Sequence, residues 1–200
     1  MTKKISIQDI ERLHRKYAPN DKVFNLVYEH CQIVSEIALW CSDNISDEIV
    51  VNKQLLQTAA LLHDIGTYVF FDEDGHVSNE RLYPQHAILG SKILEDEGLD
   101  KQVYDMVATH ILLGLTKQEI IDTPWYLPEH DYEPKTIEGE LLCYADRYHS
   151  KRPSFNAFDT FLDRLKRSLP LQAAKFELWS KRFGIPDIDL LANKYEQPVR

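Results

Sequence analysis

The chain has 200 residues, and its hydrophobic share of 44% allows a packed core and excludes a disordered polypeptide. A formal charge of −9 disfavours a nucleic acid polymer as a partner but leaves room for a small phosphorylated molecule. No apolar stretch approaches the roughly 18 residues of a membrane span, and no signal-peptide core is present, so we expect a cytoplasmic protein with no membrane partner.

Helical periodicity runs through nearly the whole chain and predicts an all-α fold in one domain, residues 1–200. Ser6, Asn20 and Asp21 are suitable N-caps, Pro84 suits a first turn, and Gly66 is expected to end a helix. The predicted helices, in chain order, lie at about 6–17, 20–43, 52–65, 84–97, 100–110, from 136 to about 146, 156–168 and 171–183.

Three segments are expected to lack regular helices. Residues 67–83 are expected to form a loop with a solvated turn or short hairpin at DEDG. DEDG resembles the start of a calcium-binding loop, but the further ligands of such a loop are missing. Residues 122–135 hold three prolines and form a lid or rim, whose aromatic residues Trp125, Tyr126 and Tyr132 we expect to pack within the loop. Residues 185–200 are expected to be a packed but irregular tail.

Several polar side chains occupy inward positions of these helices. A single inward histidine is usually a hydrogen-bonded core residue, but here that explanation must be repeated on one helix after another. Burying each group alone would cost several kcal/mol, whereas a shared cation converts imidazoles and carboxylates into ligands. The pattern therefore predicts a metal site in the core of a helical bundle, built from His30, His63, Asp64, His86, His110 and Asp146.

The donor types narrow the choice of metal. Four imidazoles and two carboxylates suit iron, manganese, cobalt, nickel or zinc better than calcium or magnesium. Six protein ligands are too many for one open ion, so we expect two divalent cations that share a carboxylate. The cysteines, Cys31, Cys41 and Cys143, lie within helical apolar patterns and are expected to be buried free thiols.

Five sequence blocks, in order, resemble the HD-domain superfamily of metal-dependent phosphohydrolases: VYEHCQIVSEIA, AALLHDIG, PQHAILGSKIL, ATHILLGL and LLCYADRYHSK. The resemblance spans residues 30–146 and implies about five core helices around the metals, within a ligand-bearing part of about 20–152 on which helices of 153–200 pack. It also implies an assignment of ligands to ions. His30, His63, Asp64 and Asp146 would hold one ion, commonly iron or manganese, and His86 and His110 would hold a second, with Asp64 as the bridge.

The expected activity is hydrolysis of a phosphoester or phosphoanhydride in a small, nucleotide-like molecule by a hydroxide that bridges the two metals. Asp64 would set the metal separation. Thr67 stands where the HD-GYP branch has lysine, and no GYP segment follows His110, which disfavours cyclic di-GMP hydrolysis. Two alternatives remain: a di-iron oxygenase of the same fold, and a metal-binding or ligand-binding HD protein without turnover. A homodimer is compatible with either.

Phosphate binding requires cations besides the metals. Lys151, five residues after Asp146, is the preferred catalytic candidate, because similar AD…SK blocks occur in small HD proteins; a solvated surface lysine is the competing interpretation. Further candidates are Arg147, Lys92 and Arg81. His149 is interpreted as a surface histidine in preference to a group that supports the metal site. No role is assigned to the three remaining histidines, His14, His76 and His130.

Overall fold

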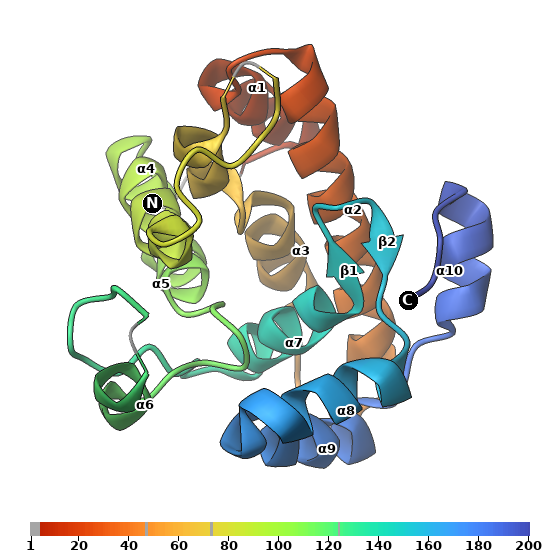
Figure 1. Cartoon of the computed structure of the whole chain (residues 1–200). Coiled ribbons are helices and arrows are strands. Elements are labelled where there is room, and N and C mark those ends of the chain that lie inside the picture. The colour runs from red at the N-terminus through yellow and green to blue at the C-terminus, as the bar shows by residue number, and fades with distance from the viewer. Residues whose placement is uncertain (1–4, 47, 73, 124) are drawn as a thin grey trace.

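Helices dominate the computed structural model, which describes residues 5–46, 48–72, 74–123 and 125–200 (Figure 1). The all-α prediction is confirmed. The α-helices are α1 Ile7–Tyr17, α2 Asp21–Asp43, α3 Lys53–Leu62, α4 His86–Asp96, α5 Lys101–Ala108, α6 Lys117–Asp122, α7 Ile137–Ala145, α8 Phe158–Ser168, α9 Pro170–Phe183 and α10 Ile188–Tyr195. Three short 3-10 helices, η1 Ile65–Phe70, η2 Tyr83–Gln85 and η3 Asp146–Tyr148, and two strands, β1 His149–Ser150 and β2 Ser154–Phe155, complete the described elements.

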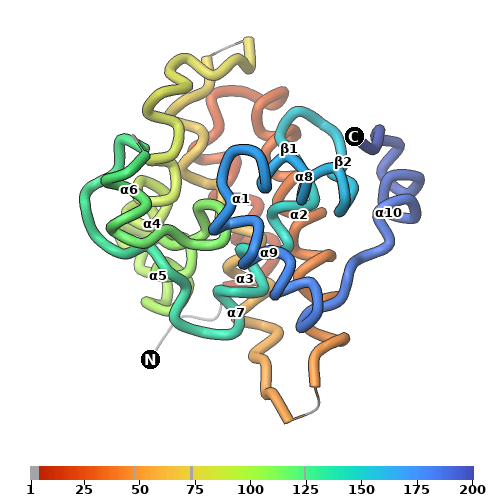
Figure 2. The backbone as a smooth tube through the Cα atoms, turned by 60° about the horizontal axis from the view of Figure 1, so that its bottom comes forward, coloured from red at the N-terminus to blue at the C-terminus, as the bar shows by residue number. Residues whose placement is uncertain are grey.

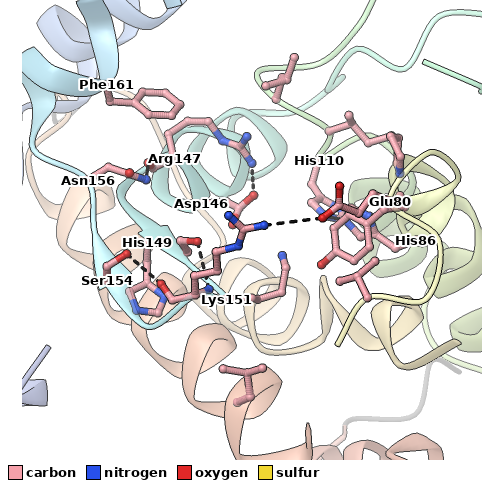
Figure 3. Close-up of a pocket in the computed structure, with 18 of the residues that line it drawn as sticks. Glu80, His86, His110, Asp146, Arg147, His149, Lys151, Ser154, Asn156 and Phe161 are labelled. Atoms are coloured by element: carbon pink, nitrogen blue, oxygen red, sulfur yellow. Dashed lines mark hydrogen bonds and ion pairs between the residues drawn. The ribbon is translucent and has the colours of Figure 1, made fainter. Parts of the chain in front are cut away.

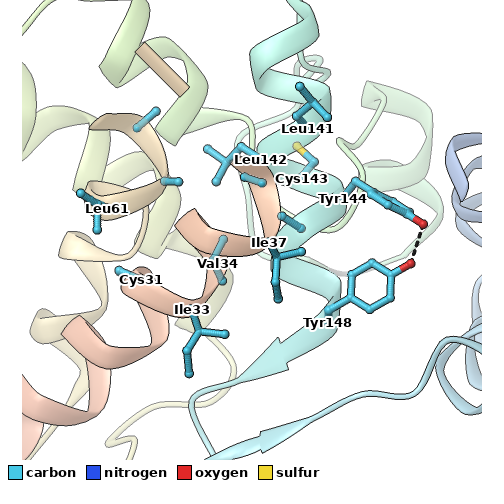
Figure 4. Close-up of a cluster of buried hydrophobic side chains, with 14 of the residues drawn as sticks. Cys31, Ile33, Val34, Ile37, Leu61, Leu141, Leu142, Cys143, Tyr144 and Tyr148 are labelled. Atoms are coloured by element: carbon cyan, nitrogen blue, oxygen red, sulfur yellow. Dashed lines mark hydrogen bonds between the residues drawn. The ribbon is translucent and has the colours of Figure 1, made fainter. Parts of the chain in front are cut away.

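Helix α2 carries the centre of the core and packs against α3 and α7. It begins where the Asn20 side chain accepts a hydrogen bond from the Val23 backbone, as expected of an N-cap. Figure 4 shows its apolar side chains facing those of α7, and the hydroxyl of Tyr144 on α7 lies 2.5 Å from that of Tyr148 on η3. All three cysteines are buried free thiols, which confirms that prediction.

The chain turns sharply after α3. The predicted helix to residue 65 is too long, because α3 ends at Leu62 and η1 follows. The role assigned to Gly66 as a helix stop is also wrong. A Cβ atom on Gly66 would lie 2.1 Å from the carbonyl oxygen of His86 and 2.4 Å from the amide nitrogen of Gly90. Glycine is needed here because η1 and α4 approach backbone to backbone, which brings residues 63 and 64 next to the start of α4.

The C-terminal segment is more regular than predicted. Instead of an irregular tail, it forms α10, whose N-cap Asp187 accepts a hydrogen bond from the Leu190 backbone. Figures 1 and 2 show α10 beside α2 and the β1–β2 hairpin, on the opposite side of the molecule from α6. Beyond α10, Val199 pairs with Phe155 in a parallel bridge, so residues 198–200 extend the hairpin by one short strand. A side-chain pattern does not reveal such pairing, because it uses backbone groups.

The two internal loops follow the predictions in part. Phe71 and Val77 pair across the predicted hairpin, in which the Asp72 carboxylate accepts hydrogen bonds from two backbone amides; Glu73 lies outside the described residues. Segment 122–135 is anchored by pairing of Tyr132 with Leu115, and Tyr132 is buried as expected. The segment contains Pro124, which also lies outside the described residues.

None of the helices in the described ranges combines the length and apolar character that crossing a bilayer requires.

Candidate metal centre

The structure brings all six predicted metal-site side chains into one buried cluster. Each lies at or beside the end of a helix, except His30, which projects from the middle of α2. His63 is the C-cap of α3, His86 opens α4, and Asp146 is the C-cap of α7. The exposed fractions are small throughout: His30 1%, His63 0%, Asp64 0%, His86 7%, His110 1% and Asp146 8%.

Asp64 lies in the middle of the cluster and faces both halves. Its Oδ2 atom is 3.1 Å from Nε2 of His30, and its Oδ1 atom is 3.2 Å from Nε2 of His86. On the first side, Asp146 Oδ1 is 3.1 Å from Nε2 of His30. Two sets of donor atoms lie close enough to hold an ion: His30, His63 and Asp146, and His63, Asp64 and His110. His63 thus belongs to both sets, whereas the resemblance to the HD-domain superfamily implied that it holds one ion.

Backbone carbonyls fix the tautomers of three histidines. The Nδ1 atoms of His63, His86 and His110 lie 2.8, 2.6 and 2.7 Å from the carbonyl oxygens three residues earlier. A carbonyl only accepts hydrogen bonds, so each Nδ1 carries the proton and each Nε2 of a neutral ring presents a lone pair. Burial lowers the pKa of His110 to about 3, which keeps that ring neutral.

Two of these lone pairs face each other. Nε2 of His86 and Nε2 of His110 are 2.9 Å apart, although neither neutral ring has a proton to place between them. Beside them, Asp64 Oδ1 is buried and accepts no hydrogen bond from any residue that the structure describes. Unsatisfied buried acceptors are costly, and a cation satisfies all three atoms at once. The residues present therefore fit a divalent metal centre.

His30 receives its orientation from a different network. Its Nδ1 atom lies 2.8 Å from Nδ1 of His149, whose Nε2 is 2.7 Å from Oε1 of Gln197. The Gln197 amide in turn donates to Glu29 at 2.9 Å, which fixes its oxygen toward His149. His149 must then donate from Nε2 and accept at Nδ1, so His30 donates from Nδ1 and presents an Nε2 lone pair to the cluster. The network thus gives His30 the same tautomer as the other three histidines.

The interpretation of His149 as a surface histidine is wrong. His149 is 5% exposed, because α7 gives way to η3 and then to strand β1 instead of continuing as a helix. Gln197 was missed, and its position far along the chain offers no local pattern that could have revealed it. His14, to which no role was assigned, is also part of the interior. It is fully buried and hydrogen-bonded to the Tyr68 hydroxyl and to the Leu61 carbonyl oxygen.

Lys151 reaches the cluster, so the competing interpretation of Lys151 as a solvated surface lysine is wrong. Its Nζ atom lies 2.5 Å from Asp64 Oδ2 and 5.6 Å from the centre of the Tyr83 ring. Burial alone would raise the pKa of Asp64, but the neighbouring groups, above all the charge of Lys151, together outweigh burial and hold this pKa well below its usual range. Conversely, burial alone would lower the pKa of Lys151, but Asp64 raises it above its usual value. Asp64 is therefore ionised and Lys151 charged at neutral pH.

The other cation candidates divide into two groups. Arg147 lies beside the cluster and pairs with Asp146, whereas Lys92 is exposed and pairs with acidic residues of its own helix. Arg81 stacks over Tyr126, 4.0 Å from the ring centre, outside the six-residue cluster.

The cluster opens into a pocket of about 850 Å³. His86, His110, Asp146 and Lys151 line it, and Trp125 of segment 122–135 contributes to its rim. Figure 3 shows His86 and His110 on one side of the pocket, with Asp146 and Lys151 between them and Arg147. A small molecule that enters this pocket therefore meets the histidines and several cations together.

The chain belongs to the HD-domain family, whose model matches residues 27–151 and so includes all six clustered residues. The recognition of the family from the sequence is thus confirmed.

Three curated relatives share parts of the chain. An uncharacterized protein of Methanocaldococcus jannaschii is 33% identical over 122 residues, which cover 60% of this chain and 64% of that protein. A tRNA (cytidine(56)-2'-O)-methyltransferase of Picrophilus torridus is 30% identical over 61% of this chain and 31% of its own length. Ribonuclease Y of Chloroflexus aurantiacus is 26% identical over 71% of this chain and 23% of its own length. The chain thus spans less than two thirds of each relative.

The HD domain of the phosphodiesterase PgpH from L. monocytogenes has a similar fold. Its crystal structure superposes with a TM-score of 0.54 at 16% identity, covering 93% of this chain and 98% of that domain. The same domain in complex with cyclic-di-AMP gives a TM-score of 0.52 at 17% identity, over 94% of this chain and 96% of that domain. At these identities the likeness concerns the fold.

Proposed function

We propose that this protein is a metal-dependent phosphohydrolase that acts on a phosphoester or phosphoanhydride of a small, nucleotide-like molecule. The observation that carries the proposal is the pair of facing Nε2 atoms of His86 and His110 beside the unpartnered Asp64 Oδ1, at the floor of a cation-lined pocket. These acceptor atoms attract a cation, and the cationic side chains of the pocket, such as Lys151 and Arg147, attract phosphate.

Two divalent cations, iron or manganese in the first place, fit the donor set. His30, His63, Asp64 and Asp146 would hold one, and His86 and His110 the other, with Asp64 shared between them. Nitrogen and oxygen donors without thiolate also admit cobalt, nickel or zinc. When bound, the metals would supply an activated water at neutral pH and neutralise charge on the phosphoryl group.

The chain's own residues would complete the site. Lys151 is charged, and its ammonium group is close enough to Asp64 to lie beside a phosphoryl oxygen held at the cluster. Because the lysine side chain is only 19% exposed, its charge is weakly screened by water and acts strongly on an anionic substrate. The backbone carbonyls behind His63, His86 and His110 keep these rings fixed, so little reorganisation is needed during the reaction.

The relatives support this class of reaction and of substrate. Ribonuclease Y and the phosphodiesterase PgpH both bear names of enzymes that cleave phosphodiesters, and the PgpH domain is described in complex with cyclic-di-AMP. We extend to this chain only the class of ligand, a small phosphorylated nucleotide. We also propose that residues 1–200 act as one unit, since the tail residue Gln197 supports the network behind His30.

The test combines metal analysis with a substrate panel. The protein is purified without chelator, its metal content is measured, and phosphate release from nucleotides is assayed with Mn²⁺ or with Fe²⁺ under anaerobic conditions. We expect two metal equivalents and release from at least one nucleotide. Oxygen consumption without phosphate release would indicate a di-iron oxygenase instead. Less than one equivalent after reconstitution would contradict both enzymatic functions.

A further inference from the structure

Beyond Lys151, the wall of the pocket is formed by residues that have no role in the hydrolysis proposed for the six-residue cluster. It consists of Arg147, which follows Asp146, the hairpin residue Asn156, two residues of α8, Phe161 and Arg164, and Arg200. In Figure 3, Arg147, Asn156 and Phe161 lie on the side opposite His86 and His110. We call Arg147, Arg164 and Arg200, with Asn156, the arginine wall.

Asn156 fixes two of the arginines. Its side-chain amide donates to the carbonyl oxygen of Arg147 at 2.8 Å, and its Oδ1 accepts from Arg164 at 3.0 Å. Arg164 also lies over the Phe161 ring, 5.0 Å from its centre. These contacts restrain the guanidinium before any ligand arrives, which lowers the entropic cost of binding one.

Arg200 is held through its backbone. Its amide donates to the carbonyl oxygen of Phe155, and its own carbonyl accepts from the amide of Ala157, both at 2.9 Å. The backbone of Arg200 is thereby held beside the start of α8, and the residue lines the same pocket. Residues of segment 147–164 and the distant Arg200 thus meet at one wall.

Two of the three arginine charges of this wall are not balanced by an ion pair within the described part of the chain. Among the described residues, neither Arg164 nor Arg200 has a carboxylate within ion-pair distance, although acidic residues outnumber basic ones by 32 to 23 in the chain. Arg147 forms an ion pair with Asp146, which would also serve the metal. Guanidinium groups bind phosphate through paired N–H donors, and a concave wall concentrates their field.

We propose that the arginine wall binds a second phosphate of the substrate, apart from the phosphate that is hydrolysed at the metal cluster. This inference rests on the proposed function and narrows its substrate class to molecules with two separated phosphate groups. The wall would hold the distal phosphate while Lys151 and the metals receive the scissile one. A substrate with one phosphate would leave Arg164 and Arg200 without a counter-charge and bind more weakly.

Binding can be tested without turnover. Alkanebisphosphonates of increasing chain length, whose P–C bonds resist hydrolysis, are titrated into the metal-loaded protein by calorimetry, with alkylmonophosphonates of the same lengths for comparison. We expect at least one bisphosphonate to bind about tenfold more tightly than its monophosphonate, which is the effect of one charge-assisted hydrogen-bonded contact. If no bisphosphonate of any length binds more tightly than its monophosphonate, the proposal is wrong.

Variants locate the effect. Arg164→Gln combined with Arg200→Gln should abolish the preference for bisphosphonate, and replacement of both by lysine should restore part of it because the charge remains. Arg167→Gln is the matched control, since Arg167 lies on the same helix, is exposed and does not line the pocket. The metal content of every variant is measured. A preference that survives the double glutamine variant would contradict the proposal.

A parallel assay separates this inference from the proposed function. Phosphate release is measured from alkanediol bisphosphates of the preferred length and from the corresponding monophosphates. A bisphosphonate preference without any phosphate release would support the arginine wall and contradict the hydrolase. Phosphate release without a preference for two phosphates would support the hydrolase and contradict the arginine wall.

Discussion

The Nδ1 atoms of His30 and His149 lie 2.8 Å apart, and this contact determines which nitrogen of His30 faces the six-residue cluster. Because Gln197 accepts from Nε2 of His149, His149 can only accept at Nδ1, and His30 must donate there. His30, the predicted ligand in the middle of α2, is thus oriented by a residue of the tail, whereas the other three histidines of the cluster use nearby backbone carbonyls.

Gln197→Leu should weaken metal binding by about 10-fold to 100-fold, the usual effect of losing a residue that orients a metal ligand. Without the acceptor, His149 can adopt the other tautomer and His30 no longer presents a fixed lone pair. Metal affinity is measured by competition with a chromogenic chelator. Gln118→Leu is the control, because the Gln118 side chain donates a hydrogen bond to Asp122 on the surface of α6, away from the cluster. Equal affinities of the two variants would contradict the tautomer argument.

Asp64→Ala and His86→Ala should differ in metal stoichiometry. Removing Asp64 takes away the carboxylate that faces both halves of the cluster, so we expect neither metal binding nor activity. Removing His86 should cost mainly one ion, because the donors of the other half remain. Elemental analysis after reconstitution gives the number of ions per chain. Two ions bound to His86→Ala would disprove the assignment of the second site.

Lys151→Met should separate metal binding from turnover. Lys151 neutralises Asp64 in this structure, so its loss frees a carboxylate oxygen, and we expect metal affinity to be equal or higher. Activity should nevertheless fall by about 10²-fold, because a charge that stabilises the phosphoryl group is missing. Lys92→Met serves as control, since Lys92 is exposed and pairs within α4. A variant that loses its metals would show that Lys151 has a structural role instead.

The buried His14 should make the metal-free protein less stable in mild acid. Burial lowers its pKa from 6.5 to about 4, so the unfolded chain takes up this proton at a higher pH than the folded one. Stability is therefore lost as pH falls below 6.5, and the loss continues until about 4. Between about pH 7 and about pH 5, His14 should lower the free energy of unfolding by about 2 kcal/mol.

Urea unfolding of wild-type and His14→Gln proteins with chelator at the two pH values measures this contribution. The variant lacks the titrating group, so its free energy of unfolding should fall by about 2 kcal/mol less than that of the wild type. Other buried histidines affect both proteins equally and cancel in the difference. An equal fall in the free energy of unfolding in both proteins would mean that His14 titrates normally in the folded state.

Gly66→Ala should lower stability and metal content together. The added Cβ meets backbone atoms of His86 and Gly90, so α4 must move away from η1, at a cost of about 3 kcal/mol. This movement displaces His86 and should weaken the second metal site. In the control Gly98→Ala, no atom lies near the added Cβ, and only the positive φ of 76° costs about 1 kcal/mol, without effect on metal binding. Thermal unfolding and elemental analysis compare the two.

The six clustered residues were accessible from the sequence because each lies in a helical pattern whose apolar neighbours show which side is inward. His149 and Gln197 were not accessible in this way. The helical pattern around Asp146 gives no sign that the chain turns into strand β1, and the pairing of Val199 with Phe155 uses backbone groups. Gly66 shows the same limit, since its closest contacts are backbone atoms of α4.

The helices were predicted well where a cap or a proline marks an end, as at Ser6, Asn20 and Thr136. The short helix α6 and the final helix α10 were missed. α6 offers fewer than two turns, too few to establish a period, and α10 follows a proline that favours a loop. The extent of the functional unit, residues 1–200, stays a prediction.

The contact between Gln197 and His149 also bears on the order of events during biosynthesis. His30 emerges from the ribosome early, Asp146 much later, and Gln197 later still. Before residue 197 has been synthesised, the nascent chain lacks the acceptor that fixes His149, and with it the preferred tautomer of His30. We therefore expect tight metal uptake only after translation, and a message truncated before this codon should yield a chain that keeps all six clustered residues and still competes poorly for metal.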